Sequence, residues 1–276
     1  MNGNNVHFDI NPIAPESYVR TVTQCLAVVD EDADAYPMHH RKRKAIIFNH
    51  EIFEHDNLLR RLGTQADVDR LNIVLKSYNF EVFVHNDLEL GHFCTTLEEI
   101  RKEDFTDVDC IAIFVLTHGK WNKLAAKNFY YTPELLWNTF TAERCPSLGG
   151  KPKMFFINAC RGEMKDYGVE YVGNLVTDGP NPNPEIKYKL PIHTDILIAF
   201  STVEGYVSHR NEVNGTWFIQ TLCEILSDDR CNGMEIKQIL TRVSRRVAIR
   251  CNLRNSKTSQ VPTVVSTLIR DLHFNS

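Results

Sequence analysis

The stretch MFFINACRGE, residues 154–163, decides the fold, because it joins a short apolar run to a cysteine and a charged turn. Met154–Asn158 has the composition of a strand that is buried on both faces of a parallel sheet. Cys160 comes directly after that strand, where open α/β sheets place their functional groups. A second apolar run, Cys110–Leu116, ends in the same way at His118. The two runs therefore predict two strands with a reactive side chain beyond each carboxyl end.

If these strands are neighbours, the thiol of Cys160 and the imidazole of His118 emerge at the same edge of the sheet. The thiolate is the reactive form of a cysteine, and a nearby histidine can take its proton. Gly119 lets a backbone N–H approach a substrate carbonyl closely, because no side chain intrudes. The pattern indicates a thiol nucleophile with a histidine base, although one cysteine of eight and one histidine of eleven form a weak signal alone.

Apolar strands and amphipathic helices alternate along the rest of the chain, which predicts an α/β fold. We expect a central, mostly parallel sheet of about six strands with helices on both faces. Pro262 cannot donate to a sheet ladder, so the last strand is expected at an edge. The expected strands are Ala45–Phe48, Glu81–His85, Cys110–Leu116, Met154–Asn158, Ile196–Phe200 and Val261–Leu268. The expected helices are 64–78, 95–103, 133–140, Trp217–Leu226 and Ile236–Ile249.

Thr64 is expected to cap the first of these helices, and Asp67 to interact with its positive N-terminus. Two stretches lack the alternation. Residues 1–40 are polar and acidic, which predicts a flexible N-terminal segment. Residues 166–190 are rich in glycine and proline, which predicts a linker. The expected organisation is one domain whose halves, 41–165 and 191–276, share one sheet.

The composition points away from several classes of protein. A net charge of -4 and a pI near 6.3 give no overall attraction to nucleic acid or to an anionic membrane. The basic run His39–Lys44 is expected to be a solvated flank. The longest apolar run is too short to span a bilayer, and no signal-peptide pattern is visible. The cysteines lack zinc spacing, so we expect reduced thiols, no metal and no cofactor, and a cytoplasmic location.

Several segments together resemble the caspase family, specifically its insect-like effector type with a short prosegment. The NACRG motif around Cys160 is similar to the family's nucleophile motif, and its histidine, in Thr117-His118-Gly119, lies 42 residues upstream. The further segments that match, in the family's order, are RLGT (61–64), SHRN (208–211), GTWFIQ (215–220) and LTRV (240–243). The resemblance covers residues 40–276 and implies a three-layer sandwich.

The resemblance also implies an activity, cysteine endopeptidase cleavage after aspartate. Cys160 would attack the carbonyl, His118 would move the proton, and the backbone N–H groups of Gly119 and Cys160 would stabilise the oxyanion. Arg61 and Arg210 would bind the aspartate side chain, because a guanidinium pair recognises a carboxylate by charge-assisted hydrogen bonds. The further substrate-binding residues that the resemblance implies are Asn158 and Ser208.

Activation and partners follow from the same resemblance. The chain would be an apoptotic zymogen that an upstream initiator caspase cuts in the linker. Asp178, which glycine follows, is a better candidate for this cut than Asp166, which tyrosine follows. Asp32 or Asp34 would mark removal of the prosegment. Other implied partners are protein substrates with an exposed aspartate, a second copy or a caspase paralogue that pairs through the last strand, and inhibitor-of-apoptosis proteins.

The chain departs from the family pattern at a few positions. Asn158 stands where the family has glutamine, and Val207 and His209 replace aromatic residues of the substrate groove. Lys120 follows His118-Gly119 where the family is acidic, and a cation there is expected to lower the pKa of His118. These departures leave two alternatives: an enzyme with a shifted preference, or a catalytically impaired decoy that regulates an active paralogue by dimerisation or by competing for its partners.

Overall fold

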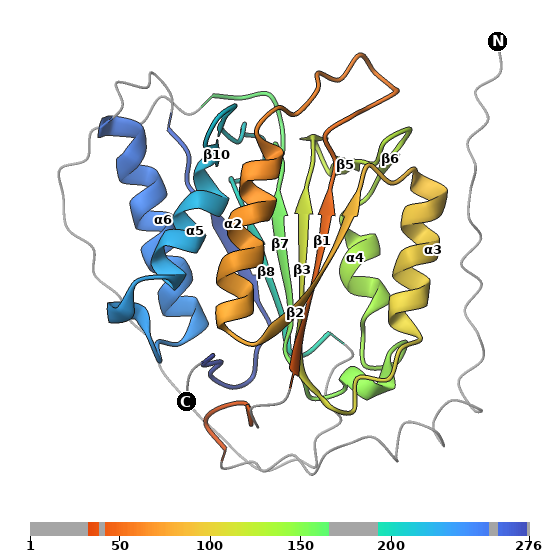
Figure 1. Ribbon diagram of the computed structural model, residues 1–276, viewed down its shortest axis with the longest axis vertical. Coiled ribbons are helices and arrows are strands. Elements are labelled where there is room, and N and C mark those ends of the chain that lie inside the picture. Colours follow the sequence, from red (N-terminus) through yellow and green to blue (C-terminus); the bar gives the residue numbers. More distant parts are fainter. Residues whose placement is uncertain (1–32, 39–41, 166–192, 254–258, 275–276) are drawn as a thin grey trace, which may run out of the picture.

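A six-stranded sheet forms the centre of the computed structural model, which describes residues 33–38, 42–165, 193–253 and 259–274 (Figure 1). The strands are β1 (Lys42–Asn49), β2 (Phe80–Asn86), β3 (Val108–Leu116), β7 (Lys153–Asn158), β8 (Ile196–Phe200) and β11 (Thr263–Ser266). Their order is β11-β8-β7-β3-β1-β2, and every pair is parallel except β11 with β8. The predicted α/β sheet, its six strands and its edge strand are confirmed.

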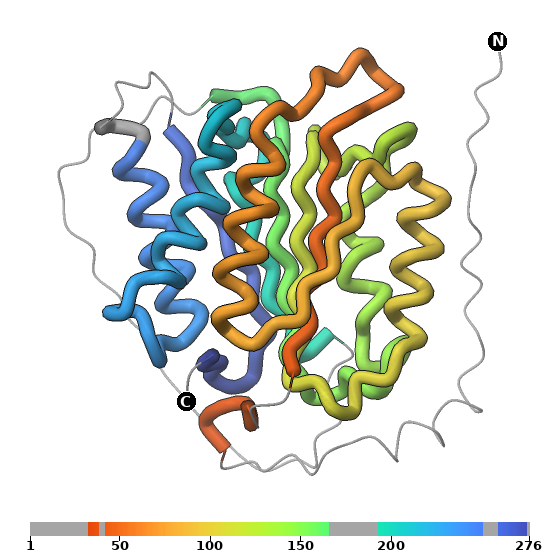
Figure 2. Tube along the Cα trace, in the orientation of Figure 1, coloured from red at the N-terminus to blue at the C-terminus, as the bar shows by residue number. Residues whose placement is uncertain are grey.

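Helices cover both faces of this sheet, as predicted. One face carries α2 (Thr64–Ser77), α5 (Trp217–Leu226) and α6 (Ile236–Leu253), and the other carries α3 (Leu90–Arg101) and α4 (Glu134–Thr139) (Figures 1 and 2). Short 3₁₀ helices lie at Pro146–Leu148 and Asp229–Cys231. In the central strand β3, Cys110, Ala112, Phe114 and Leu116 pack toward the first layer, and Ile111, Ile113 and Val115 toward the second. This alternation separates two hydrophobic clusters.

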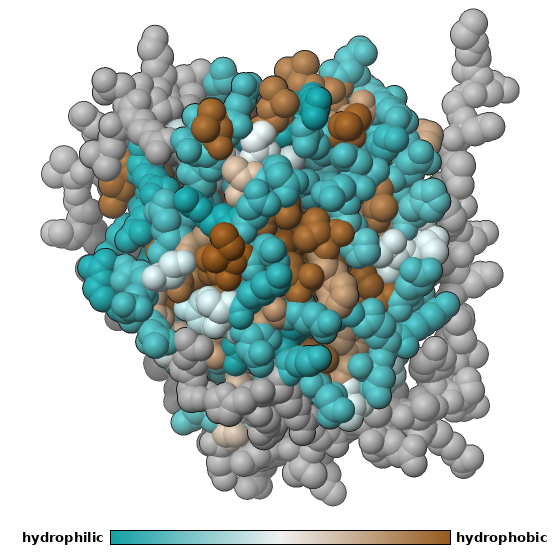
Figure 3. Space-filling model, in the orientation of Figure 1, coloured by the Kyte–Doolittle hydropathy of each residue, from teal (hydrophilic) through white to brown (hydrophobic). Residues whose placement is uncertain are grey.

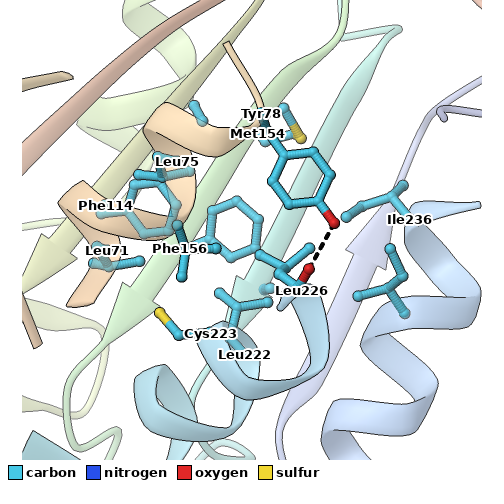
Figure 4. Packing of buried hydrophobic residues seen from close by; sticks show 14 of the residues in the cluster. Leu71, Leu75, Tyr78, Phe114, Met154, Phe156, Leu222, Cys223, Leu226 and Ile236 are labelled. Atoms are coloured by element: carbon cyan, nitrogen blue, oxygen red, sulfur yellow. Dashed lines mark hydrogen bonds between the residues drawn. The ribbon is translucent and has the colours of Figure 1, made fainter. Parts of the chain in front are cut away.

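The cluster under α2 and α5 is closely packed around aromatic side chains (Figure 4). Phe114 of β3 and Phe156 of β7 stack with their ring centroids 4.6 Å apart. Tyr78, which ends α2, donates its hydroxyl hydrogen to the Leu226 carbonyl at 2.6 Å. The hydrogen bond satisfies a polar group inside an apolar cluster and ties α2 to the end of α5.

Several local predictions need correction. Thr64 is the first residue of α2 rather than its cap: the cap position is Gly63, and the Thr64 hydroxyl donates to Asn49 Oδ1 at 2.6 Å. Helix α3 begins at Leu90, earlier than predicted. The sequence contains no sign of this start, because Glu89 at the cap position makes no side-chain capping hydrogen bond. The sequence patterns missed two small sheets because their strands are too short to show a period: β4 (Gly119–Lys120), β5 (Lys123–Ala125) and β6 (Tyr130–Tyr131), and the hairpin of β9 (Arg210–Asn211) and β10 (Gly215–Thr216).

The end of the predicted N-terminal segment is not free of the domain. Tyr36 and Met38 are buried in the core, and Ala35 pairs with Asp271. The prediction of a flexible segment is therefore wrong for residues 33–38, and residues 1–32 lie outside the described residues, as does the predicted linker from 166 onward. Strands β7 and β8, which flank that linker, pair in parallel, so both halves build one sheet.

Tyr36 fastens this segment through its hydroxyl, which gives a stability prediction. The hydroxyl donates to Asp195 Oδ1 at 2.8 Å and accepts from the Ile269 N–H at 3.1 Å. Tyr36→Phe leaves both groups short of a partner inside the protein, so we expect a loss of about 1–3 kcal/mol of unfolding free energy in urea titrations.

Tyr131→Phe is the matched control. Tyr131 is also buried, but among the described residues its hydroxyl has no hydrogen-bond partner. Removing that oxygen should leave stability unchanged or raise it slightly, because the buried group is already unsatisfied. Equal losses in both variants would show that the Tyr36 hydrogen bonds do not hold the segment.

Candidate active site

Cys160 and His118 come together at the carboxyl ends of neighbouring strands. Leu116 of β3 pairs with Asn158 of β7, and each reactive residue follows its strand by the same two positions. The two segments that follow these strands are also in contact: a Cβ placed on Gly119 would lie 2.3 Å from the Cys160 carbonyl oxygen. Only glycine permits this approach, so the small residue predicted for a substrate contact also brings the two strand ends together.

His118 is oriented by a backbone carbonyl. Its Nε2 lies 2.7 Å from the Leu59 oxygen, and its ring lies 4.8 Å from that of Phe53. A carbonyl only accepts, so Nε2 carries the hydrogen and Nδ1 keeps its lone pair. The pKa of His118 is lowered to about 4: burial is the main cause, the charges of Arg61 and Arg210 also lower it, and the hydrogen bond to Leu59 partly opposes them. The imidazole is therefore a neutral base at neutral pH.

Lys120 does not cause this lowered pKa. The direction of the predicted shift is right, but the predicted cause is wrong. The Lys120 ammonium lies 2.8 Å from Asp56 Oδ2 and 4.0 Å from the centroid of the Tyr130 ring. This ion pair anchors the β4–β5 hairpin to the loop that follows β1, and the carboxylate screens the charge of Lys120.

The sulfur of Cys160 is held by the backbone of Ser208. The Ser208 N–H donates to Sγ at 3.3 Å, and the thiol lies 3.8 Å from the Ser208 carbonyl oxygen. Gln260 supports this loop: its Nε2 donates to the Ser201 carbonyl, and its Oε1 accepts from the His209 N–H, both at 2.7 Å. Ser208, predicted as a substrate-binding residue, contacts the nucleophile Cys160 through its backbone, and its role in binding a substrate stays a prediction.

Two arginines lie within electrostatic reach of Cys160. Arg61, only 2% exposed, donates Nη1 to the His50 carbonyl and to Thr64 Oγ1, both at 2.9 Å. Arg210 is half-buried on β9. Burial lowers the pKa of both guanidinium groups, and the charge of Arg210 lowers that of Arg61 further. Arg61 remains protonated at neutral pH, because its lowered pKa is still about 9. The two arginines therefore place positive charge near the thiol, and their role in binding a substrate stays a prediction.

Asp67 is a buried acid whose charge acts on both arginines, as does the charge of Glu51, and the sequence reading missed this role. Its carboxylate is 1% exposed and accepts from the Thr216 N–H at 2.9 Å and from the Thr216 hydroxyl at 2.8 Å. Burial raises its pKa to about 6, against these hydrogen bonds and the charges of Arg61 and Arg210. The sequence did hold a signal, because Asp67 lies on the same helical stripe as Leu71 and Val74.

Two glycines let the Arg210 hairpin approach the start of α2. A Cβ on Gly63 would lie 2.4 Å from the Glu212 carbonyl oxygen, and one on Gly215 would lie 2.1 Å from Asp67 Oδ1. Both glycines also have left-handed backbone angles, with φ of 83° and 85°. The GTWFIQ and RLGT segments therefore meet in space at two positions where only glycine fits.

The other predicted positions are placed as follows. Asn158 ends β7 and is buried, and its Oδ1 has no hydrogen-bond partner within the described part of the chain; its role as a substrate ligand stays a prediction. The His209 ring packs on Trp217 with centroids 4.7 Å apart. Asp34 accepts a hydrogen bond from the Asp271 N–H at 2.8 Å, whereas Asp32 and Asp178 lie outside the described residues.

The sequence of the chain is similar to those of known proteins. A family model described as the caspase domain matches residues 42–273. The chain is 43% identical to Caspase-1 of Spodoptera frugiperda over 255 residues, which cover 89% of this chain and 83% of that protein. It is 39% identical to Caspase drICE of Drosophila melanogaster, over 94% of this chain and 77% of that protein.

A solved structure is similar as well. The crystal structure of Caspase-1 from Spodoptera frugiperda superposes with a TM-score of 0.78 at 40% identity, and the match covers 90% of this chain and 96% of that one. Within the described ranges, no helix of this chain combines the length and the apolar character needed to cross a membrane.

The electrostatics of the site give a prediction for His118. In the folded protein its pKa should lie near 4 rather than near 6.5, as read by NMR titration of labelled histidines. Arg210→Gln removes a positive charge that opposes protonation, so the pKa of His118 should rise in this variant.

His50 is the internal control for this titration. It is fully buried, and burial also lowers its pKa to about 4, but the charges that act on it are those of Asp87 and Arg61. Arg210→Gln should therefore leave the pKa of His50 unchanged. A pKa near 6.5 for His118, or an equal shift in the pKa values of His118 and His50, would contradict the electrostatic account.

Proposed function

The chain belongs to the caspase family of cysteine proteases, and we propose that it cleaves peptide bonds after aspartate with Cys160 as nucleophile. The observation that carries the proposal is the position of Arg61 and Arg210. Both guanidinium groups lie within electrostatic reach of the thiol, and the charges of Asp67 and Glu51 act on both of them. An aspartate side chain of a substrate would add a negative charge and hydrogen-bond acceptors beside these two cations.

The chemistry begins with a proton transfer. The Nδ1 lone pair of His118 takes the thiol proton of Cys160, and the sulfur attacks the carbonyl carbon that follows the bound aspartate side chain. As the C–S bond forms, the carbonyl oxygen becomes an oxyanion. The backbone N–H groups of Gly119 and Cys160 are the donors that would stabilise this oxyanion.

Collapse of this intermediate breaks the C–N bond. The leaving amine takes the proton from His118, and the acyl group stays on Cys160 as a thioester. His118 then takes a proton from a water molecule, whose oxygen attacks the thioester carbon. The C–S bond breaks as His118 returns the proton to the sulfur, which releases the new carboxyl end and restores the free thiol. The Leu59 carbonyl would keep the ring in one tautomer throughout these steps, because it accepts the Nε2 hydrogen.

The biological setting is part of the proposal. We place the protein in apoptosis as an effector caspase of the cytoplasm, where a free thiol stays reduced. It would be made as a zymogen, with an upstream initiator caspase cutting after Asp178. Of the two prosegment sites, Asp32 is preferred, because the backbone around Asp34 and Ala35 is already engaged with Asp271.

Caspases also form dimers, and strand β11 offers the surface. Within the described residues β8 is the only strand that pairs with β11, so the other edge of β11 is open. Val265 on this strand is half-exposed. An open edge with apolar side chains favours pairing with another strand, and we propose a second copy of this chain or a paralogue as the partner.

The proposed chemistry predicts covalent labelling by an aspartyl fluoromethylketone, which needs the nucleophile, the base and the arginine pocket together. Cys160→Ala should abolish labelling. Arg210→Ala should slow it by at least about 100-fold, because a charge-assisted contact to the probe is lost. The rate of adduct formation is read by mass spectrometry.

Two other residues supply controls. Cys94→Ala removes another partly exposed free thiol, and Arg60→Ala removes an exposed arginine paired with Glu51. Neither change should alter labelling. An adduct that survives in Cys160→Ala, or a rate that is indifferent to Arg210, would overturn the proposal.

The zymogen proposal predicts a cut after Asp178 when the chain is incubated with an active initiator caspase, followed by a rise in the labelling of Cys160. Asp178→Ala should block the cut and the rise, and Asp166→Ala should block neither. Fragment masses give the site of the cut. A cut without a gain in labelling would favour the decoy, and no cut within 166–192 would reject this activation scheme.

The same samples test the dimer. Sedimentation of both cut and uncut chain at tens of micromolar should show a dimer, with a strand paired on β11. Monomer alone in both samples would reject the pairing.

A further inference from the structure

We propose that Trp121 and Met164 form a leaving-side subsite, so that this protease favours a bulky apolar or aromatic residue within the first two positions after the cleaved aspartate. This inference rests on the proposed function and names a substrate class for it. The residues concerned lie apart from the arginine pocket and serve no other role in the site.

The two sides of Cys160 belong to opposite faces of the sheet. Arg61 leads into α2, and the hairpin with Arg210 leads into α5, and both helices pack in one hydrophobic cluster. Trp121 lies between β4 and β5, and the residues that follow it, Leu124 and Ala126, pack in the other cluster with α3 and α4. Figure 1 shows this division, with β10 and α2 on one side of the strands and β5 and β6 on the other.

This division fixes where the leaving segment goes. An extended substrate advances about 3.3 Å per residue, so its residues on the two sides of the cleaved bond lie on the two sides of the sulfur. With the aspartate side chain between the arginines, the chain after the bond must pass over the α3 and α4 side. The first side chains that it meets there come from the turn after Gly119 and from the segment after Cys160.

Trp121 and Met164 are the apolar side chains at this place. They are 64% and 52% exposed, although each is large and hydrophobic. Both reach Gly205: measured from a Cβ placed on that glycine, Met164 Cε lies at 2.4 Å and Trp121 Cζ3 at 3.8 Å. The two side chains therefore border one surface, and a ring laid on it would remove apolar area of both from water.

Hydrogen bonds fix this surface to the nucleophile. The Gly205 N–H donates to the Arg161 carbonyl at 3.0 Å, and the Arg161 N–H donates to the Tyr206 carbonyl at 2.9 Å. The Met164 N–H donates to the Gly205 carbonyl at 3.0 Å. Since Arg161 directly follows Cys160, the distance between the sulfur and the apolar surface is set by backbone contacts rather than by a free loop.

Two of the cations that lie close to Trp121 and Met164 in the sequence are already paired with carboxylates: Lys120 with Asp56, and Arg161 with Glu204 at 3.4 Å. The Arg161 guanidinium also lies 4.0 Å from the centroid of the Phe200 ring. Figure 3 shows hydrophobic side chains among hydrophilic ones at the end of the molecule where the strands finish.

The test uses peptides that share the sequence of Leu175–Asp178 and differ only after the aspartate. One continues with Gly-Gly, one with Tyr-Gly and one with Gly-Tyr, with a fluorophore and a quencher at the ends. We expect kcat/KM for the better tyrosine peptide to exceed that for the glycine peptide by about tenfold. Trp121→Ala and Met164→Ala should each bring this ratio toward one.

Phe129→Ala is the matched control, because Phe129 is an aromatic residue of similar exposure, 62%, on the next turn of the same small sheet. It should keep the ratio of the unchanged chain. Labelling by the aspartyl fluoromethylketone, which has no residue after the aspartate, counts the competent sites in each variant. Equal rates for all three peptides, or a ratio that survives both substitutions, would overturn the subsite. Absence of both labelling and cleavage would instead reject the proposed function itself.

Discussion

The arrangement of this site depends on one electrostatic constraint: two positively charged side chains are held close to a thiol. Arg61 and Arg210 come from distant parts of the sequence, and bringing their guanidinium groups together out of water is unfavourable without acceptors and a counter-ion. The His50 carbonyl and the Thr64 hydroxyl supply acceptors, and Asp67 and Glu51 supply negative charge that acts on both arginines. Burial still lowers the pKa of both guanidinium groups, so the pocket remains an unfavourable place for two cations. In the proposed function, a bound acidic side chain would relieve this cost.

This requirement explains the arrangement of the elements around the site. Asp67 lies on α2, and Thr216 directly precedes α5, so their hydrogen bonds join the starts of the two helices at the edge where the strands end. Gly63 and Gly215 leave the space that this approach needs. The charged machinery thus occupies one face of the sheet, and the small sheet β4–β6 with its exposed apolar residues is left to the other.

The sequence revealed those parts of the molecule that repeat a simple period. Runs such as Cys110–Leu116 could be recognised as strands, because a strand that is buried on both faces consists almost entirely of apolar residues. Contacts made by single residues left no such trace. Gln260 precedes a short edge strand and nevertheless holds the loop at Ser208. Tyr36 ends a polar stretch, and only its distant partner Asp195 explains its burial. Asp67 alone carried a readable signal, an acid on an apolar stripe.

The positive charge of the arginines also bears on the base. Arg61 and Arg210, which we propose to bind the substrate's aspartate, are the same groups whose charges help to lower the pKa of His118. An aspartate side chain bound between Arg61 and Arg210 would cancel part of that field, and the imidazole would become a stronger base as the substrate arrives. A neutral side chain in the pocket leaves the field in place and the base weak. Recognition of aspartate would then act on proton transfer as well as on binding, because one pair of charges serves both.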